Sequence, residues 1–161
     1  MTLELVDLRP AASADRWWTP PFDSTVIYEH PHWWNQQVGD ESWFVQVLEH
    51  GTEVARVEFD DPGGINPNYE GVPELGDERL EIQFIEVASA ARGRGIGTRL
   101  VHRLADLHSD RRFFAYSQEA DGFWDSLGWE PFYDGSVPGS GVSDGGVSVP
   151  DVRGPSRESL W

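Results

Sequence analysis

The sequence predicts one mixed α/β domain, built on a central sheet with a strand–turn–helix unit at its middle. At 161 residues, with 39% hydrophobic and 12% aromatic content, the chain is long enough to bury a substantial core. Residues 42–60 form two β-rich runs around His50 and Gly51, which predict an antiparallel hairpin. Residues 79–108 read as a buried strand, a glycine-rich turn and an amphipathic helix.

The part of the chain before the hairpin predicts little regular structure after a first strand. Residues 2–8 alternate between apolar and polar side chains, as a strand does. Residues 10–38 are rich in Pro, Trp and His, and they predict no more than short helical turns. Residues 61–78, after the hairpin, hold many Gly, Pro and acidic residues and predict a loop.

The central strand is predicted over residues 79–88, in the interior of the sheet. Its apolar side chains fall into two sets: Leu80, Ile82 and Phe84 are expected on one face, and Ile85 and Val87 on the other.

The elements after the central strand follow from the same periodicities. A helix is expected from about residue 95 to residue 108, because Ile96, Leu100, Leu104 and Leu107 recur at helical spacing. Further elements are predicted as a strand at 111–117, a short helix at 123–128 and a strand at 129–133.

The C-terminal residues 134–161 have the composition of a linker, with six Gly, six Ser and three Pro. We therefore expect the domain to span residues 1–133. Val147 and Val149 could still supply a last strand. Leu160 and Trp161 are expected to anchor the tail on the domain or on a second copy of the chain, in which case the protein would be a homodimer.

Composition excludes several function classes. The chain has 28 acidic and 12 basic residues and a net charge of −16, which argues against nucleic acid and anionic lipid as partners. It has no cysteine, which excludes disulfides and thiolate catalysis. No segment resembles a membrane span or a signal peptide, so a cytoplasmic location is expected.

One short region has the opposite charge. Residues 92–112 hold six arginines against two aspartates, gathered around Gly93, Gly95 and Gly97. Glycines and helix N-terminal N–H groups beside positive charge favour an anionic ligand. The turn does not match the Walker A loop, which requires a lysine that the chain does not have. It does not match the dinucleotide fingerprint GxGxxG either, because the sequence here is GRGIG. A tight strand-to-helix turn with incidental arginines stays open as the alternative.

Arg92, Gly95 and Gly97 match the pattern Arg/Gln-x-x-Gly-x-Gly, which resembles the acetyl-coenzyme A signature of the GCN5-related N-acetyltransferase (GNAT) family. A second motif of that family follows at the expected separation. It is carried by Ser117, Ala120, Phe123, Trp124, Gly128 and Trp129. The resemblance is clear over residues 79–133, extends to residues 2–60 through the order of the strands, and is absent for the tail.

The resemblance implies a mixed, mostly antiparallel sheet flanked by helices, with acetyl-CoA as the acyl donor in the cleft where the fourth and fifth strands splay apart. It implies transfer of an acetyl group to a primary amine. The residues that it implies for cofactor binding are Ile85, Glu86, Val87, Arg92, Gly93, Arg94, Gly95, Ile96, Gly97, Thr98, Ser117 and Trp124.

The resemblance also suggests catalytic groups. Glu81 lies where one branch of the family carries its glutamate base, and Glu86 is the second candidate for the base. Many members use a tyrosine to protonate the leaving thiolate, but that position is Trp124, whose indole is not an acid at neutral pH. Tyr116 is the expected substitute, with Tyr133 as a further option. This departure leaves a second function open, a non-catalytic or weakly active protein that binds acyl-CoA.

The acceptor is expected to lie against the aromatic segment before the hairpin. Its tryptophans, with nearby acids, suit a small cationic amine; they are Trp17, Trp18, Trp33 and Trp34, beside Asp15, Asp23 and Glu29. The alternative that these rings are core or an oligomer contact is equally open. His30 and His32 have a metal-ligand spacing, but no third ligand is evident, so no metal site is predicted.

Overall fold

The structure is a computed structural model, and it describes residues 2–11, 18–35, 42–117, 120–135 and 147–150. Predictions made for Asp15, Trp17, Leu160 and Trp161 lie outside these residues. In the described part of the chain, no helix is long and apolar enough to cross a membrane.

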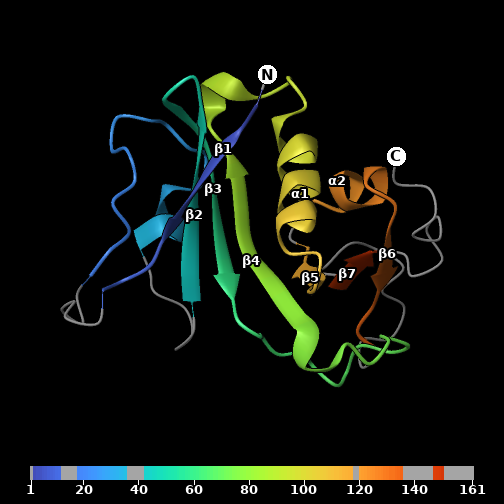
Figure 1. Cartoon of the computed structure of the whole chain (residues 1–161). Coiled ribbons are helices and arrows are strands. Elements are labelled where there is room, and N and C mark those ends of the chain that lie inside the picture. Colours follow the sequence, from blue (N-terminus) through green and yellow to red (C-terminus); the bar gives the residue numbers. More distant parts are fainter. Residues whose placement is uncertain (1, 12–17, 36–41, 118–119, 136–146, 151–161) are drawn as a thin grey trace.

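The described residues form one seven-stranded mixed sheet in the order β1-β2-β3-β4-β5-β7-β6 (Figure 1). Neighbouring strands are antiparallel except for the parallel pair β4 and β5. The predicted mixed, mostly antiparallel fold is confirmed. The strands are β1 (Glu4–Leu8), β2 (Ser42–Glu49), β3 (Thr52–Asp60), β4 (Arg79–Val87), β5 (Arg112–Tyr116), β6 (Trp129–Phe132) and β7 (Val147–Pro150). The expected domain boundary after residue 133 stays a prediction.

Two α-helices follow the central strand, α1 (Ile96–Leu107) and α2 (Asp121–Ser126). Helix α2 starts two residues before its predicted position, with Asp121 in the first turn, where a carboxylate favours the helix dipole. It ends before Gly128, whose φ of 76° only glycine adopts readily. Short 3-10 turns lie at Pro31–Asn35, Gly76–Glu78 and Ser89–Ala91.

The hairpin between β2 and β3 turns at two residues with positive φ, His50 at 52° and Gly51 at 77°. Two such residues match the right-handed twist of the strands that they join. Strand β3 is buried on both faces, since Arg56 and Glu58 are buried on one face and Val57, which lies between them, is buried on the other. It is therefore a central strand, although its sequence alternates.

A bulge in β4 changes the predicted distribution of its side chains. Glu58 pairs with Phe84 and Phe59 pairs with Ile82, so Gln83 is an extra residue in β4. One extra residue reverses the alternation beyond it. Ile85 and Val87 therefore share the α1 face with Leu80 and Ile82, in the main core. Phe84 lies on the opposite face, where it stacks on Trp33; the prediction that grouped Phe84 with Leu80 and Ile82 was wrong.

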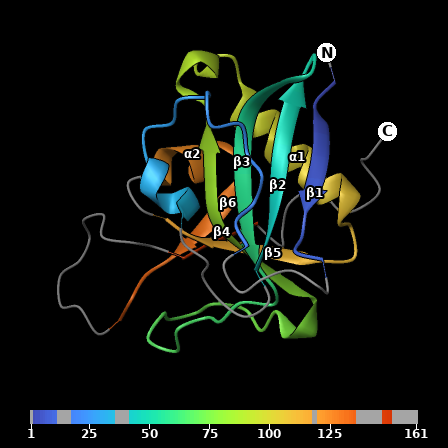
Figure 2. The same ribbon diagram turned by 90° about the vertical axis from the view of Figure 1, so that its left-hand side faces the viewer.

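The two faces of the sheet are covered by different parts of the chain. Helix α1 packs one face with Ile96, Leu100, Val101 and Leu104. The segment that holds Pro31–Asn35 lies across the opposite face (Figure 2), with Tyr28 and Trp34 buried. The buried position of Trp34 shows that at least one of the four tryptophans belongs to the core.

Strands β4 and β5 pair over only three residues, from Arg79 to Glu81 on β4 and from Arg112 to Phe114 on β5. Beyond Glu81 the two strands diverge (Figure 1), and β7 takes the other side of β5. In the described residues, the later half of β4 therefore has no strand beside it on this edge. This open edge is where the candidate site lies.

Candidate functional site

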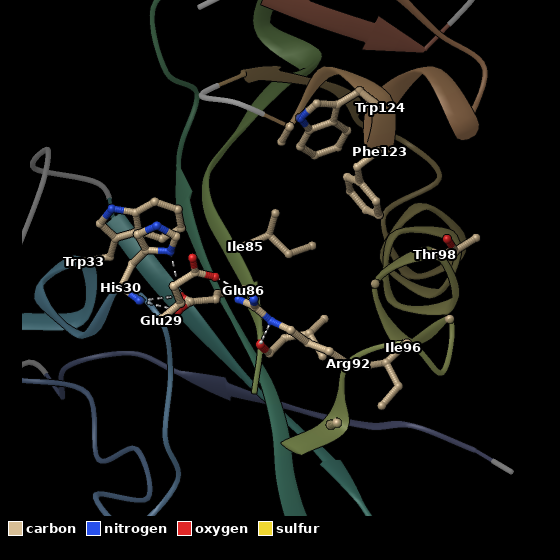
Figure 3. Close-up of a pocket in the computed structure, with 16 residues that line it drawn as sticks. Glu29, His30, Trp33, Ile85, Glu86, Arg92, Ile96, Thr98, Phe123 and Trp124 are labelled. Carbon is tan, nitrogen blue, oxygen red and sulfur yellow. Dashed lines mark hydrogen bonds and ion pairs between the residues drawn. The ribbon is translucent and has the colours of Figure 1, made fainter. Parts of the chain in front are cut away.

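A cavity of about 590 Å³ lies at the open edge of β4 (Figure 3). One wall is the glycine turn with the start of α1, a second is α2, and a third is the segment from Glu29 to Trp33. Of the residues that we predicted for cofactor binding, the cavity brings together Ile85, Glu86, Val87, Arg92, Gly93, Gly95, Ile96, Gly97, Thr98 and Trp124.

The turn requires glycine at its three positions for two different structural reasons. Gly93 and Gly95 have φ of 75° and 71°, which a residue with a side chain adopts only with strain. Gly97 instead lacks room, because a Cβ there would lie 3.1 Å from the Phe123 ring and 3.7 Å from Val87. The turn thus brings α1 close to both β4 and α2.

The N-terminus of α1 opens into the cavity. Gly95 is its N-cap and provides no side-chain cap, and Ile96, Gly97 and Thr98 line the cavity. The first N–H groups of a helix have no partner within it, and with the helix dipole they make a site that suits an anion.

The arginines of the turn are paired with acids. Arg92 lines the cavity, and its Nη1 lies 2.5 Å from Oε2 of Glu29. This hydrogen bond and the positive charge hold the pKa of the Glu29 carboxyl below its usual range. The Arg92 pair joins the glycine turn to the segment on the other face of the sheet.

Arg94 points to a different part of the molecule. It forms a very short ion pair with Glu49, whose other carboxylate oxygen lies 3.2 Å from Nη2 of Arg99. The Glu49 side chain is almost inaccessible, and the hydrogen bond from Arg94 lowers its pKa. Arg94 is not among the residues described as lining the cavity, so its predicted role in cofactor binding stays a prediction.

A second, smaller cavity of about 140 Å³ lies beside the first. Its walls include the bulge residue Gln83 and the rings of Phe84 and Tyr116. The two cavities share four lining residues, Trp33, Ile85, Ala120 and Trp124. They are therefore adjacent spaces, with Ile85 at the boundary between them.

Glu81, the predicted base, is buried beneath the loop that follows β3 and is 5% exposed. Burial, with Asp60 nearby, raises its pKa to about 7 against a hydrogen bond from the Gly64 N–H. Among the described residues it lines neither cavity, although its neighbour Ile82 lines the smaller one. A carboxyl with this pKa could accept a proton near neutral pH.

Tyr116 lines the smaller cavity, and its hydroxyl is held by the same loop. The hydroxyl donates to the Gly64 carbonyl at 2.8 Å and accepts from the Asn66 N–H at 2.8 Å. Burial raises its pKa above the usual value. Glu81 and Tyr116 thus both contact the loop that follows β3. Of the two, Tyr116 lines the smaller cavity and Glu81 does not.

The remaining predicted cofactor residues follow β5. Trp124 is buried, packs on Trp129 at a centroid distance of 4.6 Å and contributes to both cavities. Ser117 is buried outside the described lining of either cavity, and its Oγ has no hydrogen-bond partner among the described residues.

Sequence reasoning did not assign His30 to this site. It was considered only for its spacing to His32, and within the described residues no group of three potential ligands is placed to hold a metal ion. His30 lines the larger cavity beside Glu86 and Trp33. No local sequence signal marks it, because its position depends on packing between residues 56 apart in sequence.

The model of the acetyltransferase (GNAT) family matches residues 10–129 of the sequence. The chain belongs to this family. The match spans the open edge of β4, the glycine turn and α2, the elements that build the larger cavity. None of the curated proteins compared with this GNAT chain matches it.

Two solved structures share the fold. A GNAT family acetyltransferase from Elizabethkingia anophelis, with acetyl-CoA bound, is 10% identical with a TM-score of 0.53, over 92% of this chain and 97% of that one. E. coli YhhK, bound to coenzyme A, is 16% identical with a TM-score of 0.51, over 93% and 99%. An acetyltransferase from Thermus thermophilus is 16% identical with a TM-score of 0.48, over 68% of this chain. The matched region spans 64% of the Thermus protein's length.

Proposed function

We propose that the protein is an acetyl-CoA-dependent N-acetyltransferase that acts on a primary amine. The observation that carries the proposal is the pair of adjacent cavities at the open edge of β4, which meet at Ile85. A transferase needs one space for the donor and one for the acceptor, joined where the reacting atoms meet. Membership of the GNAT family makes acetyl-CoA the expected donor.

The larger cavity suits coenzyme A because a helix N-terminus and an open strand edge both line it. The pyrophosphate would lie at the N-terminus of α1, where Gly93 and Gly95 keep side chains away from the backbone. The pantetheine arm would run along Ile85, Glu86 and Val87, whose backbone lies on the open edge of β4. β5 pairs with β4 only at Arg79–Glu81. The pantetheine arm would take the place of a neighbouring strand for the later residues of β4 and bond their backbone groups.

The smaller cavity is the proposed acceptor site. Its rings, Trp33, Phe84 and Tyr116, could pack on an alkyl amine or stabilise a cation. The net charge of −16 also favours approach of a positively charged substrate. We therefore propose a small cationic amine as the acceptor.

The proposed reaction is direct attack of the neutral amine on the thioester carbonyl. The C–N bond forms, the C–S bond breaks, and the proton lost by the nitrogen balances the one gained by the thiolate. Glu81, through intervening water, is the proposed base, and the Tyr116 hydroxyl is the proposed acid. The Glu81 pKa of about 7 supports this role, since the carboxylate and its acid are then both populated at neutral pH.

The rival function is acyl-CoA binding without transfer. It is favoured by Trp124, which lines both cavities and has no ionisable group to act as the acid, and by the Tyr116 hydroxyl, which is already hydrogen-bonded on both sides. Thiol release from acetyl-CoA, followed with a panel of alkyl amines and polyamines, separates the two functions. Transfer is supported by amine-dependent thiol release that Glu81→Gln reduces about 100-fold. Tight binding with no release for any amine would support the rival.

A further inference from the structure

His30 is fixed to the sheet by the carboxylate of Glu86. The backbone N–H of His30 donates to both carboxylate oxygens, at 2.9 Å and 3.3 Å, and Oε2 also lies 3.4 Å from Nδ1 of the ring. The Glu86 side chain is only 3% exposed. One buried carboxylate therefore fixes the position of the His30 backbone and also lies beside Nδ1 of its imidazole (Figure 3).

Aromatic stacking fixes the plane of the same ring. The imidazole lies parallel to the Trp33 ring, with centroids 4.0 Å apart and 7° between the planes. Trp33 stacks in turn on Phe84, at 4.9 Å and 18°. Phe84 has this orientation because of the β4 bulge. The three stacked rings hold His30 at the wall of the donor cavity, next to a residue that also lines the acceptor cavity.

The two nitrogens of this imidazole have different surroundings. Nδ1 is buried and lies 3.4 Å from Oε2 of Glu86, without a hydrogen bond within the described residues, whereas the side chain as a whole is 38% exposed. The solvent contact of the side chain therefore lies on its other atoms, which include Nε2. A carboxylate facing Nδ1 favours the tautomer with the proton on Nδ1 and leaves the Nε2 lone pair free.

We propose that His30 is a catalytic residue and that Glu86 is its positioning residue. This inference rests on the proposed function. Glu81 then removes the proton that a cationic amine must lose before it attacks, and His30, in place of Tyr116, carries the second proton from the amine nitrogen to the sulfur. Nε2 takes the proton that the amine nitrogen loses as the C–N bond forms and the C–S bond breaks. The imidazolium then gives that proton to the coenzyme A sulfur. Acetyl-CoA and a neutral amine thus yield the amide and coenzyme A, with the imidazole regenerated.

The tautomer of His30 is testable without any substrate. In long-range nitrogen–proton NMR correlation spectra of the full chain, the neutral His30 ring should carry its proton on Nδ1 and none on Nε2. Glu86→Gln should remove this preference. A ring protonated on Nε2 in the wild-type protein would overturn the proposal, because that nitrogen could not then accept a proton.

The kinetic test uses thiol release with the best amine of the panel. His30→Ala should lower kcat about 100-fold, and added imidazole should restore part of the loss. His30→Phe keeps a ring to stack on Trp33 and should be as slow as His30→Ala. His102→Asn, at an exposed position of α1, is the matched control. Coenzyme A affinity, measured by calorimetry, should be the same for all four proteins.

The outcomes distinguish this inference from the proposed function. An active wild-type protein whose kcat survives His30→Phe, or whose His30→Ala variant gains nothing from imidazole, would overturn the role of His30 alone. A wild-type protein that binds coenzyme A and transfers no acetyl group to any amine would overturn the proposed function, and the role of His30 with it.

Discussion

Arg92 and Glu29 meet at the donor cavity, with Nη1 2.5 Å from Oε2, although they are 63 positions apart in the sequence. The two side chains are 46% and 57% exposed, so solvent screens the pair and it contributes little to stability. The ion pair matters instead for ligand binding. An anionic ligand that binds Arg92 must compete with Glu29.

Removing this competitor should strengthen cofactor binding. Glu29→Gln frees Arg92 and takes one negative charge from the cavity, so we expect acetyl-CoA to bind several-fold more tightly at low salt. Arg92→Gln should weaken binding by a similar factor. Titration calorimetry at two salt concentrations measures both effects. Equal affinities for Glu29→Gln and the wild-type protein would show that the ion pair does not oppose the ligand.

Arg92 and Arg94 should differ in their effect on the same measurement. Arg92 lines the cavity, whereas Arg94 is paired with the buried carboxylate of Glu49. Arg94→Gln should therefore weaken acetyl-CoA binding less than Arg92→Gln does. It should instead lower the melting temperature, because Glu49 then keeps only Arg99 as a described ion-pair partner. A larger loss of affinity from Arg94→Gln would place Arg94 among the cofactor ligands.

The cost of a side chain in the glycine turn can be predicted from its backbone. Gly95 has φ of 71°, and a Cβ there would meet nothing within 4 Å. Gly95→Ala should cost about 1 to 2 kcal/mol through backbone strain alone. Gly95→Asn should cost less, since asparagine tolerates the left-handed region. Urea denaturation of both variants checks this order, and equal stability of Gly95→Ala and wild type would contradict the turn geometry.

Glu81 should make the stability of the protein depend on pH. Its pKa is raised to about 7 from 4.5, so the folded state binds the proton more tightly than the unfolded state does. This contribution is fully present below the unfolded pKa and is lost as the pH rises toward 7. Glu81→Gln lacks the effect, so its stability relative to wild type should rise by on the order of 2 kcal/mol from about pH 5 to about pH 8.

Denaturation curves at the two pH values give this difference directly. Glu4→Gln, which changes an exposed carboxylate on β1, is the matched control and should show no such trend. A constant difference between Glu81→Gln and wild type would mean that Glu81 ionises as an ordinary carboxyl.

Local periodicity was enough to predict the main elements. The hairpin at 42–60 has its turn at His50 and Gly51, and α1 carries the apolar spacing that predicted it. The glycine spacing around Gly95 was informative because positive φ and close packing restrict those positions to glycine. These features depend on neighbours in sequence, so a pattern can reveal them.

Features that depend on contacts between distant segments were not predictable. The bulge at Gln83 follows from the pairing of β4 with β3, and it moved Phe84 to the face opposite Ile82. The ion pair between Arg92 and Glu29 joins segments more than 50 positions apart, and so does the hydrogen bond from the His30 N–H to Glu86. No periodicity along the chain encodes such contacts.

The central claim is that the glycine turn and the open edge of β4 bind acetyl-CoA. It is tested most directly by calorimetric titration of the wild-type protein with acetyl-CoA at low salt, beside Arg92→Ala and the control His102→Asn. We predict saturable binding in the micromolar range, weakened by Arg92→Ala and unchanged by His102→Asn. No binding by the wild-type protein would contradict the account and leave the glycine turn with a purely structural role.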